Sequence, residues 1–278
     1  MTMEEAGGFA TRALAQRFSL AGKVAVVTGG GGRCAEPAPA ASYRRVPECC
    51  SGGRGRPALD DAARMIEATA GAGRVASVVA DLTDEGQIAA ALQESVTLCD
   101  RVDILLNGVG SSSARRPLIE LDREDFEAVV RLNLVAGCIL PTKHLAAYWI
   151  AQQMPGAVIN IASMGSYIPL SGGWAYSAAK AAVMNQTVAH ARELAPYGIR
   201  VNAIAPGFFL GKQNRRLLMN EDGTPTPRSH SVLAHTPMGR LGEPSDLIGA
   251  AVFLASEASA FVTGVTVPVD GGFLTHGI

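Results

Sequence analysis

The apolar residues of this chain alternate between two spacings, and that alternation constrains the fold more than any other feature. Short apolar runs rich in β-branched residues are bounded by Gly or Asp, as in strands buried on both faces. Longer segments with helical spacing separate them. The pattern predicts βαβ units and an α/β fold, with a doubly wound parallel sheet in three layers. The predicted strands are 23–28, 74–80, 102–107, 157–162, 199–205 and 263–269, and the predicted helices are 85–98, 123–153, 174–195 and 245–256.

The domain organisation follows from length and from two irregular segments. A chain of 278 residues fits one α/β domain. We expect residues 1–16 to be a flexible extension and residues 17–278 to be a single domain. The segment near 210–236 is polar, contains prolines and interrupts the alternation. We therefore predict that it covers a substrate as a lid.

Charge and cysteine content exclude several classes of protein. Lys and Arg number 24 and Asp and Glu 25, whereas a dedicated nucleic-acid binder is usually basic. No stretch approaches the roughly 18 consecutive apolar residues of a membrane helix, and the N-terminus lacks a signal-peptide core. Five cysteines without CxxC or a Cys/His cluster argue against a disulfide framework and a zinc site. We expect a cytoplasmic protein without a metal site and without a nucleic-acid or membrane partner.

Three local motifs suggest chemistry. The run VAVVTGGGG (24–32) is a strand leading into a glycine-rich turn, whose backbone N–H groups can approach a pyrophosphate. Tyr176 and Lys180 lie four residues apart on a predicted helix, so they share one face. A neighbouring cation lowers the pKa of a phenol, which makes Tyr176 a usable general acid and base. Ser163 directly follows a predicted strand, at the sheet edge where ligands bind.

Each motif has an ordinary structural alternative. Glycine runs also occur in plain loops, and a Tyr–Lys pair at this spacing can be a surface coincidence. Ser163 could simply cap a helix. Asn133 lies within an apolar helical stretch, so it is either a hydrogen-bonded core residue or a functional one.

The order of the motifs is more specific than any one of them. They are TGGGG (28–32), Asp81, LLNGVG (105–110), Asn133, Ser163, YSAAK (176–180) and NAIAPG (202–207). In this order the chain resembles the short-chain dehydrogenase/reductase family over roughly residues 18–275. The resemblance implies a Rossmann-like domain that binds NAD or NADP. The implied cofactor-binding residues are Gly29, Gly32, Asp81, Leu82, Asn107, Gly108, Gly110, Tyr176, Lys180, Pro206 and Gly207.

The resemblance also implies catalytic roles. Tyr176 would donate or accept the proton, and Lys180 would lower its pKa and bind a ribose hydroxyl. Ser163 would hold the substrate oxygen, and Asn133 would support a water relay to Lys180. Family members usually associate through two long helices, here 123–153 and 174–195, so we expect a homo-oligomer, a dimer or a tetramer.

The C-terminal third is similar to the sugar-acid branch of the family, of the D-mannonate oxidoreductase (fructuronate reductase) type. The similarity lies in residues 204–228, 234–250 and 261–273. The residues expected to contact the substrate are Ser163, Tyr176, Gln213, Asn214 and Arg215. The cations of the predicted lid suit a carboxylate substrate, since an arginine can bind a carboxylate through two hydrogen bonds. The alternative is that they belong to a solvated loop and contact only water or surface acids. They are Lys212, Arg215, Arg216, Arg228 and Arg240. A polyol, a ketone or a 3-oxoacyl group is the alternative substrate.

Residues 33–57 depart from the family pattern. They have no apolar period and hold five arginines, four prolines and three cysteines. A helix and a second strand are expected here, and neither is predicted from the sequence. Arg33 and Ala35 stand where the loop normally has glycines, and Gly211 stands where the family often has Thr. We hypothesise that this stretch is read in a shifted frame, which leaves NAD or NADP preference open and makes a catalytically impaired member the rival interpretation.

Overall fold

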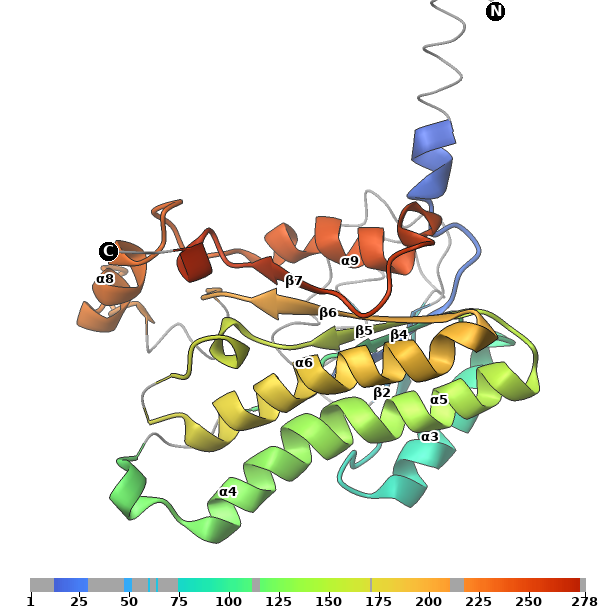
Figure 1. Cartoon of the computed structure of the whole chain (residues 1–278), viewed down its shortest axis with the longest axis horizontal. Helices are drawn as coiled ribbons and strands as arrows, with labels where there is room; N and C mark the ends of the chain where they lie inside the picture. The colour runs from blue at the N-terminus through green and yellow to red at the C-terminus, as the bar shows by residue number, and fades with distance from the viewer. Residues whose placement is uncertain are drawn as a thin grey trace, which may run out of the picture.

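The chain folds around one parallel sheet (Figure 1). The computed structural model describes residues 13–29, 48–51, 60, 64, 75–111, 116–170, 172–210 and 218–275. Within them a seven-stranded sheet has the order β3-β2-β1-β4-β5-β6-β7, with all neighbours parallel. The predicted doubly wound α/β fold is therefore confirmed. The strands are β1 (Ala25–Thr28), β2 (Glu48–Ser51), β3 (Val75–Val78), β4 (Ile104–Asn107), β5 (Gly156–Ile161), β6 (Ile199–Pro206) and β7 (Thr266–Val269).

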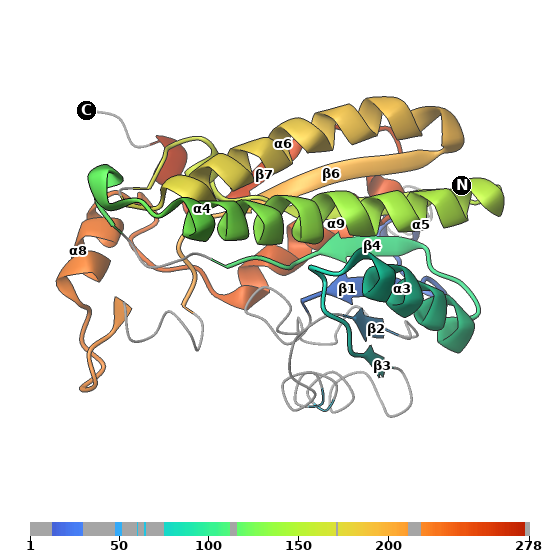
Figure 2. The same ribbon diagram turned by 90° about the horizontal axis from the view of Figure 1, so that it is seen from below.

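Helices cover both faces of the sheet, which gives the three predicted layers. Helix α3 (Glu85–Cys99), the run α4 (Arg123–Val130), η3 (Arg131–Ile139) and α5 (Leu140–Ala151), and α6 (Trp174–Leu194) lie on one face. Helix α9 (Ile248–Ala255) lies on the other face. Figure 2 shows α6 side by side with the α4–α5 run. Helix α8 (Pro227–Ala234) and residues 13–17 are also helical, and short 3₁₀ turns occupy Leu118–Glu120, Met164–Ser166, Ala195–Tyr197, Pro244–Leu247, Glu257–Ser259 and Phe273–Thr275.

The largest buried cluster lies between the sheet and the layer of α3, α5 and α6, and smaller clusters lie between the sheet and α9. Trp149 on α5 is fully buried in the largest cluster, and its indole Nε1 donates to the Val102 carbonyl oxygen (2.7 Å). All six residues of β5 are buried. The apolar runs of the sequence therefore become central strands, and their carboxyl ends all point toward one edge of the sheet.

Strand β2 corrects one sequence-based prediction. The fold requires a second strand within residues 33–57 and the residue pattern predicts none, yet Glu48–Ser51 pairs with β1 on one side and with β3 on the other. A strand between two parallel neighbours is stabilised by backbone hydrogen bonds on both edges, which require no side-chain period. The rest of the segment lies outside the described residues, and the shifted reading frame stays a hypothesis.

The predicted helix over 123–153 has an interruption that the sequence did not indicate. Arg131–Ile139, between α4 and α5, is π-helical. The run Arg123–Ala151 is long and apolar enough to cross a bilayer by length and composition alone, and 44% of its most apolar window is buried against the rest of the fold. Core helices of soluble proteins meet the same two criteria.

Cys99, the last residue of α3, is disulfide-bonded, a cross-link that the cysteine pattern did not predict.

Candidate active site

The loops that follow β1 and β4 meet at the carboxyl edge of the sheet. The Gly108 amide lies 3.2 Å from both the carbonyl and the hydroxyl oxygens of Thr28. Gly29 has a φ of +76°, and a Cβ built on it would lie 3.1 Å from the Gly108 carbonyl carbon. Neither loop tolerates a side chain here, so backbone groups are presented to whatever binds at this edge.

Tyr176 and Lys180 lie on the first turns of α6. Lys180 is 3% exposed, and its Nζ donates to the Ile161 carbonyl oxygen (2.6 Å) at the end of β5. The same Nζ lies 5.9 Å from the centre of the Tyr176 ring. The predicted pair is therefore brought together beside the strand that leads to Ser163, with an ammonium group in a desolvated setting.

Asn133 belongs to the same cluster. It is fully buried in η3, and its Nδ2 donates to the carbonyl oxygens of Ser111 (2.7 Å) and Val129 (2.9 Å). Its Oδ1 is buried and has no hydrogen-bond partner among the described residues. A Cβ built on Gly110 would lie 2.5 Å from this Oδ1 and 3.2 Å from Lys180 Nζ. A free buried acceptor beside the α-carbon of Gly110 and an ammonium group suits a bound water.

Ser163 caps the turn that follows β5. Its Oγ accepts a hydrogen bond from the Gly165 amide (3.1 Å), as the structural alternative required. The hydroxyl can still donate its proton elsewhere, because capping uses only an acceptor lone pair. The contact of Ser163 with substrate stays a prediction.

Three predicted cofactor residues have their side chains engaged within the protein. Asp81 Oδ1 accepts from the amide (2.9 Å) and the hydroxyl (2.7 Å) of Thr83. The Leu82 side chain is buried in the core. Asn107 Nδ2 donates to Thr142 Oγ1 (3.0 Å) and Asn160 Oδ1 (2.9 Å). The Leu82 and Asn107 side chains therefore serve the packing of the fold, and contacts of these residues with a cofactor stay predictions.

The buried polar network around Asn107 was missed by sequence reasoning. Asn160 Nδ2 donates to Thr187 Oγ1 (2.9 Å), whose hydroxyl donates to the Val183 carbonyl oxygen (2.8 Å). The network ties β4 and β5 to α6. The sequence feature that could have revealed this network is a polar residue inside an apolar run, such as Asn160 in VINIA (158–162). The same feature drew attention to Asn133.

Gly207, which follows β6, makes a close backbone contact with the end of β7 and the residue after it. Its amide donates to the Val269 carbonyl oxygen (3.0 Å). A Cβ at this position would lie 2.7 Å from the Asp270 α-carbon. The chain after Pro206 therefore requires glycine at this position for space. The remaining predicted site residues lie outside the described residues; they are Gly32, Gln213, Asn214 and Arg215.

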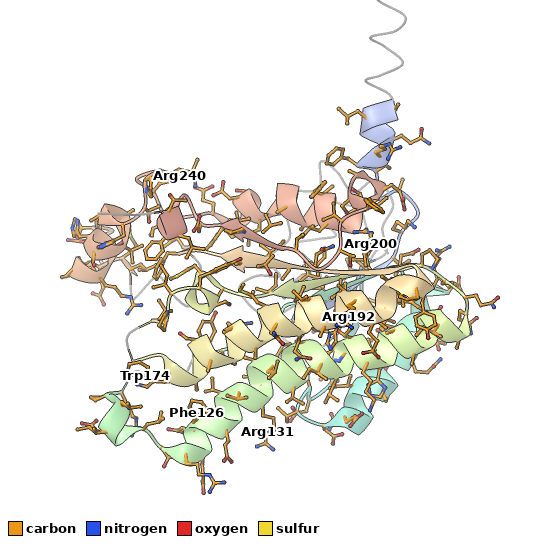
Figure 3. The ribbon with its side chains drawn as sticks, in the orientation of Figure 1. Phe126, Arg131, Trp174, Arg192, Arg200 and Arg240 are labelled. Atoms are coloured by element: carbon orange, nitrogen blue, oxygen red, sulfur yellow. The ribbon has the colours of Figure 1, made fainter. Side chains whose placement is uncertain are left out.

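Trp174, the first residue of α6, is a further residue that sequence reasoning missed. Its indole Nε1 donates to the Arg116 carbonyl oxygen (3.1 Å). Figure 3 shows Trp174 and Phe126 of α4 at the same end of the two helices. Both line a small pocket with Leu121 and Gly172. Trp174 thus ties the segment before α4 to the helix that carries Tyr176.

Arg240 does not behave as a substrate-binding lid residue. Its guanidinium donates to both carboxylate oxygens of Asp246, at 2.6 and 2.9 Å. These hydrogen bonds hold the pKa of Asp246 down at about 2. Both terminal nitrogens of the Arg240 guanidinium donate to a surface acid, so for this cation the solvated-loop alternative is correct. Lys212, Arg215 and Arg216 lie outside the described residues.

Arg240→Gln should therefore lower thermal stability slightly, on the order of 2 °C at pH 7, because exposed ion pairs contribute little. The lowered pKa of Asp246 means that its contribution is present above the ordinary value of 3.8 and is lost as pH falls toward about 2. The difference between parent and variant should thus shrink below pH 4. Denaturant unfolding followed from pH 7 to pH 3 tests this, and a difference that grows in acid would contradict it.

Comparison with known proteins agrees with this geometry. Residues 56–274 match the family model described as enoyl-(acyl carrier protein) reductase, a match that begins near the end of the irregular segment 33–57. The uncharacterized oxidoreductase UxuB of Bacillus subtilis is 39% identical over 274 residues, which cover 93% of this chain and 97% of that protein.

Two solved structures extend the comparison. One is a putative D-mannonate oxidoreductase from Haemophilus influenza with bound NAD, with 34% identity and a TM-score of 0.85 over 95% of this chain and 99% of that one. The other is a gluconate 5-dehydrogenase from Burkholderia cenocepacia in complex with NADP and tartrate. It has 32% identity and a TM-score of 0.82 over 94% and 99% of the two chains.

Proposed function

This chain belongs to the short-chain dehydrogenase/reductase family and is an NAD(P)-dependent oxidoreductase, and we propose that it interconverts the hydroxyl and carbonyl forms of a sugar acid. The observation that carries the catalytic part of the proposal is that Asn133 and Lys180 meet beside Gly110, with the Tyr176 ring centre 5.9 Å from Lys180 Nζ.

The described residues fit a nicotinamide dinucleotide at the carboxyl edge of the sheet. The loops that follow β1 and β4 are bare backbone there, because a Cβ on Gly29, Gly108 or Gly110 would lie within 3.1 Å of another protein atom. Their backbone, with that of Leu82 and Pro206, would hold the cofactor, which supplies or accepts the hydride when bound. The protein's own contribution is to orient the substrate and to move one proton.

The proton is assigned to Tyr176. In the direction of reduction, its hydroxyl donates to the substrate oxygen while the Ser163 hydroxyl polarises the same carbonyl. The buried ammonium of Lys180 favours the phenolate that forms. The donated proton stays on the product hydroxyl, so the Tyr176 phenolate needs a new one, which a water held by Asn133 Oδ1 would pass from solvent toward Lys180. These roles stay predictions for each residue.

The sugar-acid part rests on two kinds of support. The relatives are named for mannonate and gluconate substrates, which are sugar acids. The predicted lid contains Lys212, Arg215 and Arg216 within five residues, and a cationic lid suits a carboxylate. A 3-oxoacyl or other carbonyl substrate is the second candidate, favoured by the acyl-carrier description of the matching family model. A cytoplasmic location and a dimer or tetramer stay predictions.

Cofactor titration followed by a substrate panel tests the proposal. We expect saturable quenching or enhancement of NADH or NADPH fluorescence on binding. We then expect turnover of fructuronate or mannonate that exceeds turnover of a polyol or an acetoacetyl thioester by about tenfold or more, since a carboxylate grip is lost with uncharged substrates. Preference for the thioester would favour the second candidate. A protein that is folded by circular dichroism but binds neither cofactor would support the catalytically impaired alternative.

A further inference from the structure

The long helix beside α6 changes its winding at the site. Helices α4 and α5 have ordinary α geometry, whereas Arg131–Ile139 between them is π-helical over nine residues. π-Helical segments are rare, usually short, and frequent at functional sites. The buried residues of this stretch are Asn133, Ala136, Gly137 and Cys138. Asn133 is already part of the proposed site, whereas Gly137 has no assigned role.

Gly137 lies where the loop after β4 touches this stretch. A Cβ built on it would lie 2.5 Å from the Val109 carbonyl oxygen and 3.0 Å from the Leu132 carbonyl oxygen. Both neighbours are backbone atoms, which cannot rotate away as a flexible side chain can. Gly137 is not among the glycines with positive φ, so alanine could adopt its backbone conformation. Glycine is required here for space alone.

The loop seated on Gly137 is the one that completes the catalytic cluster. Val109 is followed by Gly110, whose α-carbon lies against Asn133 Oδ1 and Lys180 Nζ. The next carbonyl, that of Ser111, accepts from Asn133 Nδ2 (2.7 Å). Three consecutive loop residues therefore touch the π-helical stretch or the groups beside it. Moving the Val109 carbonyl by even a few tenths of an ångström would move these neighbours too.

We propose that Gly137 is a positioning residue. Because it has no Cβ, the Val109 carbonyl packs directly against the π-helical stretch, and this contact fixes the position of loop 108–111 and of Asn133 relative to Lys180. Gly137 acts through these groups and contacts neither proton nor substrate. The proposal rests on the roles proposed above for Asn133 and Lys180.

Gly137→Ala is the direct test. We expect the Kd for NADH or NADPH to rise and kcat to fall, each on the order of tenfold or more, because displacement of a catalytic group by about 1 Å can reduce rates a hundredfold. The pH profile of kcat should change as well, because the proposed water relay runs through Asn133. Fluorescence titration of NADH and NADPH and steady-state kinetics over pH provide these readouts.

A matched control separates positioning from a general packing defect. A Cβ built on Gly156 would lie 2.4 Å from the Trp149 ring, an overlap as severe as that at Gly137, but at the amino end of β5. Gly156→Ala should lower Tm while its Kd and kcat stay within about twofold of the parent, since it leaves the carboxyl edge unchanged.

A second variant tests the same contact from the loop side. Val109→Gly leaves the space at Gly137 unchanged but makes the backbone that carries the carbonyl of residue 109 more flexible. It should therefore give the same pattern of raised Kd and lowered kcat, even if Gly137→Ala does not fold. Folded Gly137→Ala with Kd, kcat and pH profile unchanged would overturn the proposal, as would an unchanged Val109→Gly if the first variant is unfolded.

The outcomes for the parent protein separate this inference from the proposed function. Cofactor binding does not require the right substrate, so a parent that binds NADH or NADPH but turns over no sugar acid contradicts only the substrate proposal. Variants would then be judged by Kd. A parent that binds neither cofactor contradicts the positioning role and the catalytic proposal together.

Discussion

Replacing Tyr176 by Phe should reduce kcat by about 10²- to 10⁴-fold, the usual contribution of a general acid or base. The substitution removes one oxygen and keeps the ring, which lies 5.9 Å from Lys180 Nζ. The Kd for the nicotinamide cofactor should therefore stay within about threefold of the parent, since most contacts of the site remain. Steady-state kinetics and NADH fluorescence titration measure the two effects separately.

Tyr197→Phe is the matched control for this prediction. Tyr197 lies beyond the end of α6 and is 54% exposed, so the same atom is lost far from the site. Its variant should match the parent in kcat and Kd. If Tyr176→Phe retained more than about a tenth of the parent's kcat, the proton-transfer role assigned to Tyr176 would be wrong.

Replacing Lys180 by Met should also lower kcat by at least about 10²-fold, and it should weaken cofactor binding, yet it should not lower Tm. The Lys180 ammonium is almost fully buried and donates to the Ile161 carbonyl oxygen (2.6 Å). A buried charge is costly to desolvate, and an apolar side chain of similar volume often leaves stability unchanged or higher. Opposite effects on activity and Tm are expected of a residue kept for function.

Lys143→Met is the control for the loss of a lysine as such. Lys143 is exposed and forms an ion pair with Glu85 (2.7 Å) on the outer helical layer. Its variant should change neither kcat nor the Kd for cofactor. A Lys180→Met enzyme that is as active as the parent, or one whose activity loss is matched by unfolding, would count against a catalytic role for Lys180.

The site was predictable to the extent that sequence spacing encodes position. Tyr176 and Lys180 share a helix face because of their four-residue separation, and the structure places them together. Asn133 was noticed because a polar side chain within an apolar helix needs a partner. The role of Gly137 could not be predicted, because glycine is tolerated in many places and only a neighbouring backbone shows that space is required.

Other residues changed meaning once their neighbours were known. Arg240 looked like a lid cation in sequence, but both terminal nitrogens of its guanidinium donate to the Asp246 carboxylate. Asn107 looked like a cofactor residue, but its amide points into a network with Thr142 and Asn160. Side-chain direction depends on contacts between segments distant in the chain, which a local pattern does not contain.

The sequence by itself determined the α/β layers, the central strands and the helix face that carries Tyr176 and Lys180. These follow from periodicity, because buried strands and amphipathic helices repeat at different intervals. Only the tertiary structure decided that Glu48–Ser51 joins the sheet, that Arg131–Ile139 widens into a π-helix, and that Gly110 brings Asn133 and Lys180 together. Pairing, winding and close approach depend on which backbone atoms of distant segments meet, and these contacts are set by packing of the whole chain.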